Sequence, residues 1–154
     1  MILYTPKYFR PEELLDRATF ERFGATGLRY FRPEILRALD FIRENYPTSE
    51  KRGINVNNWV WGGKSEWRGL RMLPSTDYKP YSGHSWGAAV DMVPNGITSE
   101  QMRQWILMIH NQVKREGCLD HPIMGVRRME KGTDGWVHID ALCHGSNDIL
   151  MVNP

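Results

Sequence analysis

Three side chains that could bind a divalent metal stand in two short runs of this sequence. His84 and Asp91 belong to YSGHSWGAAVDMV, residues 81–93, and His138 belongs to GWVHIDA, residues 135–141. Structural zinc sites usually close their shell with four protein ligands rich in cysteine, whereas catalytic zinc sites use three ligands and leave one position open. Two imidazoles and one carboxylate form a set of the second kind, so they predict an open metal centre. Because 47 residues separate Asp91 from His138, spacing alone leaves the alternative of scattered surface residues.

The first run has to bend back on itself if His84 and Asp91 are to aim at one point. Residues 87–89, Gly-Ala-Ala, are too small to fill space and let backbone segments approach closely. Residues 90–93 read as a strand, which Pro-Asn-Gly at 94–96 interrupts. We therefore expect Asp91 on a strand and His84 on the approach to it.

The second run has the alternation of a half-buried strand. Trp136, His138 and Asp140 alternate with Val137 and Ile139. His138 and Asp140 therefore face the same way. Two roles stay open for Asp140: it orients a metal ligand from the second coordination shell, or it acts in the site itself.

Two motifs in this order give the chain a resemblance to a known family. The first, S-x-H-x-x-G-x-A-x-D, is carried by Ser82, His84, Gly87, Ala89 and Asp91, and the second, W-x-H-x-D, follows at residues 136–140. Together they resemble the zinc peptidases of the M15 group, over roughly residues 30–142 by motif order and coarse secondary structure. That group contains D-alanyl-D-alanine carboxypeptidases and dipeptidases, and the L-alanyl-D-glutamate endopeptidases that serve as phage endolysins. The resemblance implies that His84, Asp91 and His138 bind Zn²⁺.

The proton acceptor of that family does not carry over. Several members have Glu three residues before the last histidine ligand, or His two residues before it, where this chain has Gly135 and Trp136. Asp134 is the nearest preceding acid and is our candidate for the general base, provided that the loop folds it inward. Asp140 and Glu130 are weaker candidates.

A loop rich in Trp, Gly and Arg, residues 58–71, precedes the first motif. One interpretation is a local cluster that covers the core. The resemblance implies instead that an arginine here binds a substrate carboxylate or stabilises charge at the scissile bond, with Arg71 as first candidate and Arg68 as second. A guanidinium suits both tasks because it stays charged and donates in a bidentate geometry. Ser82 is assigned to substrate binding by the same resemblance.

The function implied by the resemblance is zinc-dependent hydrolysis of peptide bonds in peptidoglycan stem peptides. The absence of an export signal suits a phage lysis or virion enzyme, made in the cytoplasm and acting at the bacterial cell wall. The alternative is a binding or structural module that keeps the zinc site but has lost catalysis, which the missing Glu and His before His138 would explain.

The remaining patterns predict an α+β fold, with helices packed on a small, mainly antiparallel sheet and a metal cleft at its centre. Apolar periodicity and capping residues indicate helices over residues 11–24, 33–45 and 98–117. Strands are expected over 54–57, 90–93, 124–129 and 136–140, the last two joined in a hairpin that presents His138. His110 lies beside the apolar stripe of the last helix, and we expect a histidine at the edge of the core with its hydrogen bonds satisfied, in preference to a metal ligand.

Composition predicts one domain over residues 1–154. Twenty Lys and Arg against eighteen Asp and Glu are interspersed, which argues against a nucleic-acid surface. No 18-residue apolar run or signal peptide is visible, so no membrane span is expected, and we expect a monomer.

Cys118 and Cys143 are expected to be free thiols, because a chain of this size has no need of a disulfide to be stable. The alternative that Cys143 and His144 add to a metal cluster is disfavoured by their spacing. His121 and His144 receive no role.

Overall fold

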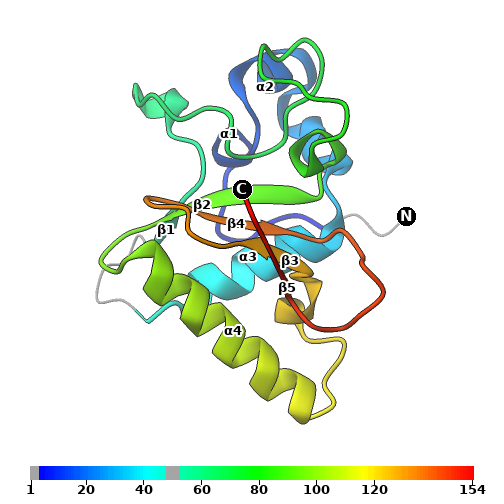
Figure 1. Ribbon diagram of the computed structural model, residues 1–154. Coiled ribbons are helices and arrows are strands. Elements are labelled where there is room, and N and C mark those ends of the chain that lie inside the picture. Colours follow the sequence, from blue (N-terminus) through cyan, green and yellow to red (C-terminus); the bar gives the residue numbers. More distant parts are fainter. Residues whose placement is uncertain (1–3, 48–52) are drawn as a thin grey trace.

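The computed structural model describes residues 4–47 and 53–154, which form a five-stranded sheet and several helices (Figure 1). The α-helices are α1 (Pro11–Leu14), α2 (Arg17–Phe23), α3 (Pro33–Asn45) and α4 (Ser99–Arg115). The strands are β1 (Ile54–Asn55), β2 (Ala89–Pro94), β3 (Arg128–Glu130), β4 (Val137–Asp140) and β5 (Leu150–Val152). Short 3-10 helices span Gly24–Tyr30, Trp59–Trp61, Gly83–Trp86 and Pro122–Gly125.

The strand order of the sheet is β1-β2-β4-β3-β5. Every neighbouring pair is antiparallel except β3 and β5, which are parallel. The predicted α+β class with a mainly antiparallel sheet is therefore confirmed. The predicted hairpin before His138 is also present, because β3 pairs with β4.

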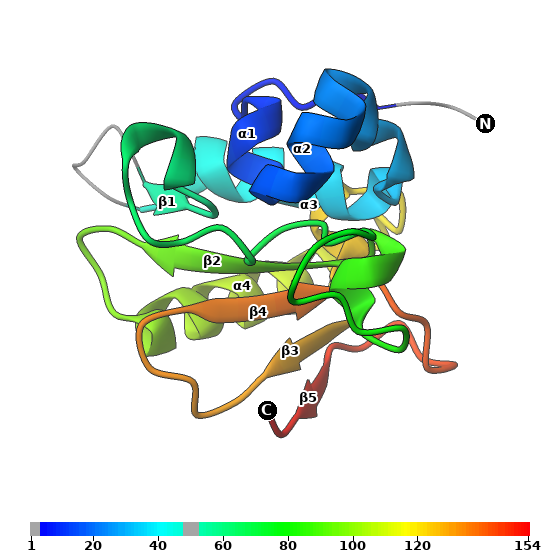
Figure 2. The ribbon, with the colours of Figure 1, turned by 90° about the horizontal axis from the view of Figure 1, so that it is seen from above.

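The two faces of the sheet have different neighbours. In Figure 2, α4 lies behind the sheet, and the segment with the 3-10 helix Gly83–Trp86 lies in front of it. The side chains that alternate towards the helical side are completely buried, among them Val90 and Met92 on β2 and Val137 and Ile139 on β4. The polar residues between them, including Asp91 and His138, therefore face the opposite side.

The predicted apolar stripes of two helices supply much of the core. Ile35, Leu36, Leu39 and Ile42 of α3 are at most 1% exposed. Met102 and Ile106 of α4 join the same apolar cluster. Thr98 caps α4 as its sequence predicts, because its hydroxyl accepts a hydrogen bond from the Gln101 backbone N–H.

The helix predicted over residues 11–24 is wrong as a single element, because the chain breaks between α1 and α2. Leu15 is extended and forms a bridge with Leu70, and the Asp16 N–H donates to the Leu70 carbonyl. The Asp16 side chain then caps α2 by accepting from the Thr19 N–H. A pairing with a distant loop thus overrides the helical periodicity.

Two predicted strands are also longer than those observed. β1 covers only Ile54–Asn55 of the expected 54–57. Of the strand expected over 124–129, residues 124 and 125 belong to the 3-10 helix Pro122–Gly125, and β3 begins only at Arg128. His121 caps that helix by accepting from the Ile123 N–H. β5, which no pattern predicted, pairs with β3 and extends the sheet.

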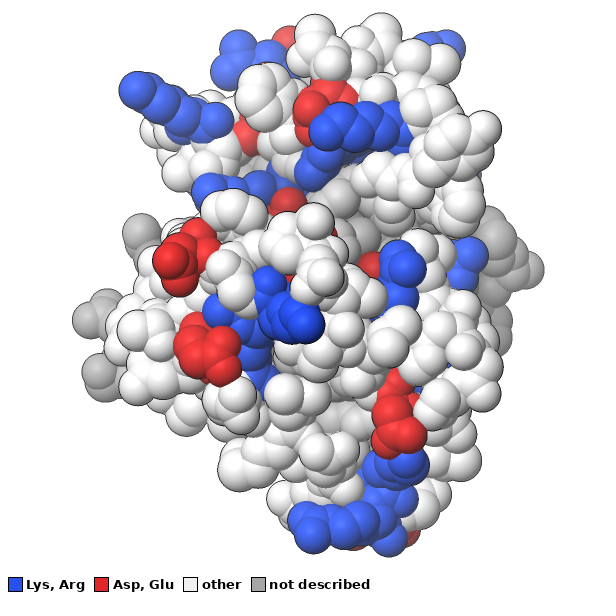
Figure 3. Space-filling view, in the orientation of Figure 1, with Lys and Arg blue, Asp and Glu red and all other residues white. Residues whose placement is uncertain are grey.

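The surface carries charges of both signs. On the face that Figure 3 shows, Lys and Arg are interspersed with Asp and Glu. Cys118 and Cys143 are exposed free cysteines. Among the described residues, no helix is long and apolar enough to cross a membrane.

His110 on α4 is fully buried, as predicted, but its ring nitrogens have no hydrogen-bond partner among the described residues, so the expectation of a satisfied histidine is wrong. Burial lowers the pKa of His110; the carboxylate of Asp148 opposes this shift, and Arg127 and Lys114 reinforce it. The unfolded chain takes up a proton near the ordinary histidine pKa of about 6.5, whereas the folded chain resists it. Stability is therefore constant above that pKa and falls as the pH drops below it.

We expect His110→Leu to remove most of this pH dependence. Between pH 7.5 and pH 5.5, the free energy of unfolding should fall by up to about 1.4 kcal/mol more in the wild type than in the variant. Urea unfolding at the two pH values measures this difference. Equal losses in both proteins would show that His110 does not stay neutral in the folded state.

Candidate metal centre

The structure brings His84, Asp91 and His138 together. One potential ligand atom from each lies within 4.8 Å of the others, and no other such group of three or more His, Cys, Asp or Glu occurs in residues 4–47 and 53–154. Asp91 on β2 stands directly opposite His138 on β4, which places both side chains on one face of the sheet. His84 reaches the same point from the 3-10 helix Gly83–Trp86 that leads into β2.

Hydrogen bonding leaves one nitrogen of His84 available to a metal. His84 is 5% exposed, and its Nδ1 lies 2.9 Å from the Gly69 carbonyl oxygen. Because a carbonyl only accepts, Nδ1 carries the hydrogen and donates. Nε2 then carries the lone pair that a metal could bind, and this atom lies 3.4 Å from Asp91 Oδ2. Backbone support of this kind is what fixes a metal-binding imidazole.

In His138 it is Nδ1 that faces the other candidate ligands, and Nε2 that contacts a supporting group. Its Nδ1 lies 2.7 Å from Asp91 Oδ1, and its Nε2 lies 3.5 Å from Asp140 Oδ2. Asp140 is 1% exposed and is held by Arg128, whose Nε donates to both carboxylate oxygens at 3.0 and 2.9 Å. Asp140 thus contacts His138 at Nε2 while Nδ1 faces Asp91, and both roles expected for Asp140 stay predictions.

The three groups are electrostatically coupled. Burial alone would raise the pKa of Asp91, but hydrogen bonds with His138 and His84 outweigh it and hold that pKa well below the usual range. Burial would likewise lower the pKa of His138, but Asp140 and Asp91 outweigh it and raise that pKa to about 9. A metal binds only neutral imidazole, so it would take the place of the proton that His138 shares with Asp91. Two nitrogens, one carboxylate and their supporting groups therefore fit a divalent metal.

Arg71 is tied into the structure by several contacts. It is 9% exposed, its Nε donates to the Trp67 carbonyl, and its Nη1 donates to the Asp77 carboxylate. Its Nη2 lies 3.7 Å from Asp91 Oδ2. Arg71 thus holds Asp91 and the loop around Asp77 in place.

Arg68 is the freer of the two arginines. It is half-buried, and its guanidinium has no hydrogen-bond or ion-pair partner in the part of the chain that the structure describes. Its backbone is engaged: the Arg68 carbonyl accepts a hydrogen bond from the Asp91 N–H at 2.8 Å. The Arg68 guanidinium is therefore unengaged among the described residues, whereas that of Arg71 is held by the Trp67 carbonyl and Asp77.

A cavity of about 280 Å³ opens at Asp91, and neither His84 nor His138 lines it. It is lined by Asp91, Arg71 and Arg68 together with Lys64, Ser65, Glu66, Trp67 and Trp136. The indoles of Trp67 and Trp136 are 42% and 37% exposed. The cavity thus combines the Asp91 carboxylate, the cationic side chains of Lys64, Arg68 and Arg71, and exposed tryptophan surface.

Two further predicted residues have defined positions. The Ser82 hydroxyl accepts a hydrogen bond from the His84 N–H at 3.3 Å and caps the 3-10 helix, so Ser82 supports His84. Asp134 is exposed in the turn between β3 and β4, outside the group of three candidate ligands. Its neighbour Thr133 is buried and accepts a hydrogen bond from Arg103, which anchors that turn.

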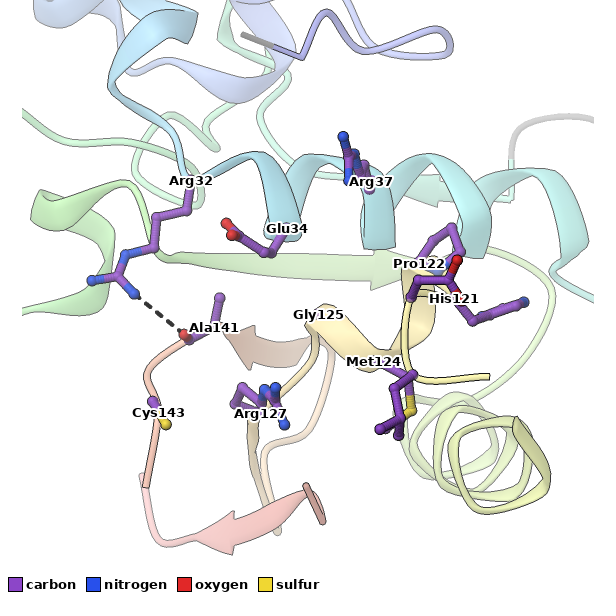
Figure 4. A pocket seen from close by; sticks show the side chains of 12 residues that line it. Arg32, Glu34, Arg37, His121, Pro122, Met124, Gly125, Arg127, Ala141 and Cys143 are labelled. Carbon is purple, nitrogen blue, oxygen red and sulfur yellow. Dashed lines mark hydrogen bonds between the residues drawn. The ribbon is translucent and has the colours of Figure 1, made fainter. Parts of the chain in front are cut away.

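The remaining histidine and cysteine near the C-terminus lie elsewhere. Cys143 lines a second cavity, of about 330 Å³, with Arg32, Arg37 and Arg127 among its walls (Figure 4). None of the three candidate metal ligands lines it. His144 Nε2 lies 3.0 Å from the carbonyl oxygens of Arg127 and Asp148. This ring is already engaged, so Cys143 and His144 do not extend the metal centre.

Sequence analysis missed three groups that support the site: the Gly69 carbonyl, the Asp77 carboxylate and the Arg128 guanidinium. Gly69 and Asp77 carry no motif, and their roles come from contacts with residues distant in sequence. Arg128 could have been found by aligning the two strands of the predicted hairpin. Comparison with protein-family models, curated proteins and solved structures gives no match to this chain, so the family resemblance rests on its motif residues alone.

Proposed function

We propose that this protein is a zinc-dependent peptidase that hydrolyses peptide bonds in peptidoglycan stem peptides. The observation that supports this best is the convergence of His84, Asp91 and His138 within 4.8 Å, each with a supporting hydrogen bond or ion pair. Three protein ligands leave a position open, as catalytic zinc sites do and structural sites do not. Zinc bound there would supply a Lewis acid that polarises the scissile carbonyl and activates water near neutral pH.

The residues around the candidate ligands divide the other tasks. Arg68 and Lys64 offer charge for a substrate carboxylate at the wall of the cavity that Asp91 lines. Arg71 keeps Asp91 in position and places a second cation beside the reacting bond. The sequence offers Asp134 as first candidate for the proton acceptor, with Asp140 and Glu130 as further candidates, and Asp134 is exposed in the turn between β3 and β4. Stem peptides carry free carboxylates, so the cavity suits them, and the protein would act at the bacterial cell wall as a phage lysis or virion enzyme.

A second candidate function is a zinc-containing binding or structural module without catalysis. The observation that favours it is the pair Gly135 and Trp136 where related peptidases carry their base, combined with the exposed position of Asp134. Such a module would bind zinc through the same three ligands. It would differ only in the absence of a positioned proton acceptor.

Muropeptide analysis tests both functions. The zinc-loaded protein is incubated with muropeptides released from purified bacterial sacculi, and the products are identified by mass spectrometry. Peptidase activity predicts new masses that differ by the loss of one or more stem residues, and no such masses with the His84→Ala protein. Unchanged muropeptides with the zinc-loaded wild type across the tested pH range would favour the binding module.

A further inference from the structure

The strand register places one acidic residue, Glu130, on the face of the sheet that carries the candidate ligands. β3 and β4 pair Arg128 with Asp140 and Met129 with Ile139, so the next pair along is Glu130 and His138. Residues directly opposite in an antiparallel pair share a face, with Cβ atoms about 4.5–5.5 Å apart. On the other edge of β4, His138 stands opposite Asp91. Asp91, His138 and Glu130 therefore form one row across three neighbouring strands.

The Glu130 side chain is half-buried and has no hydrogen-bond or ion-pair partner among the residues that the structure describes. The Asp134 side chain has no such partner either, but it is exposed. By contrast, Asp140 is held by Arg128, Asp77 by Arg71, and Glu66 lies 3.6 Å from Arg17.

By strand register, Glu130 lies on the same face of the sheet as His138 and Asp91. Asp134, by contrast, is exposed in the turn that follows β3.

We propose that Glu130 is the proton acceptor of this site; this rests on the proposed peptidase function. The water oxygen forms a bond to the scissile carbonyl carbon while one water proton passes to the Glu130 carboxylate. The same proton then moves to the amide nitrogen as the carbon–nitrogen bond breaks. The products are a carboxylic acid and an amine, and Glu130 is ionised again. Glu130 suits this task because it shares a sheet face with His138 and Asp91, and its carboxylate has no hydrogen-bond or ion-pair partner among the described residues.

Kinetics of Glu130→Gln test the assignment. The amide preserves size and removes the basic oxygen, so kcat on sacculus-derived muropeptides should fall about 10²- to 10⁴-fold with little change in KM. Zinc content and the circular dichroism spectrum should match the wild type. Glu116→Gln, on the exposed C-terminal end of α4, is the matched control and should keep full kcat. Full activity in Glu130→Gln would overturn the proposal. If Asp134→Asn instead loses 10²- to 10⁴-fold in kcat while Glu130→Gln does not, Asp134 is the proton acceptor.

A binding measurement separates this proposal from the hydrolysis itself. Visible absorption of the Co²⁺-loaded protein follows acetate binding at the metal. A negative side chain facing the metal repels acetate, so Glu130→Gln should bind acetate about three- to tenfold more tightly than the wild type, and Glu116→Gln should not. Equal affinities would show that Glu130 does not face the metal and would overturn the proposal. If the affinities differ but the wild type cleaves no muropeptide, Glu130 is placed correctly and the peptidase function fails.

Discussion

His84→Ala and His138→Ala should each abolish stoichiometric zinc binding. Each change leaves only two protein ligands. It also removes the imidazole that the Gly69 carbonyl contacts in the case of His84, or that Asp140 contacts in the case of His138. Loss of a supporting group alone typically weakens metal affinity 10- to 100-fold, and loss of the ligand itself should cost more. Elemental analysis after dialysis against metal-free buffer should find one zinc per wild-type chain and almost none in either variant.

His144→Ala is the matched control for these variants. It removes an imidazole that contacts two backbone carbonyls away from the candidate ligands, so one zinc per chain should remain. Full zinc content in His84→Ala or His138→Ala would remove that residue from the coordination shell. Circular dichroism of the same samples shows whether a loss of zinc comes with a loss of fold.

Gly87→Ala should destabilise the chain by about 3–5 kcal/mol, the second large effect that we expect. Gly87 has φ +62°, and a Cβ there would lie 2.0 Å from the Tyr30 carbonyl oxygen and 2.8 Å from Phe31 Cα. Both atoms are backbone and cannot rotate away. The change therefore combines a left-handed conformation with a steric overlap. Urea unfolding of the metal-free protein measures it without a contribution from zinc.

Gly62→Ala separates these two causes. Gly62 has φ +80° and no heavy atom within 4 Å of an added Cβ, so its substitution carries the conformational strain alone. We expect a loss of about 1–2 kcal/mol there. A similar small loss in Gly87→Ala would mean that the segment around Tyr30 yields easily and that the close approach does not hold His84 in place.

The periodic and turn-forming patterns of the sequence by themselves determined several parts of this protein. The apolar stripes of α3 and α4 and the alternation of β4 are local, because side-chain direction repeats every 3.6 or 2 residues along the backbone. The small residues before β2 also predicted a close backbone approach, and Gly87 makes it. The same local reasoning placed Asp91 on a strand and put His138 and Asp140 on one face.

Only the tertiary structure decided how those residues work together. The nitrogen that each histidine offers depends on Gly69 and Asp140, and Arg71 is engaged because Trp67 and Asp77 reach it. The sequence placed Glu130 in the hairpin turn over residues 130–135, whereas the structure makes it the last residue of β3, where the strand register sets it opposite His138. A bond between segments distant in sequence leaves no local periodicity, so it shows only when the folded chain brings both partners together.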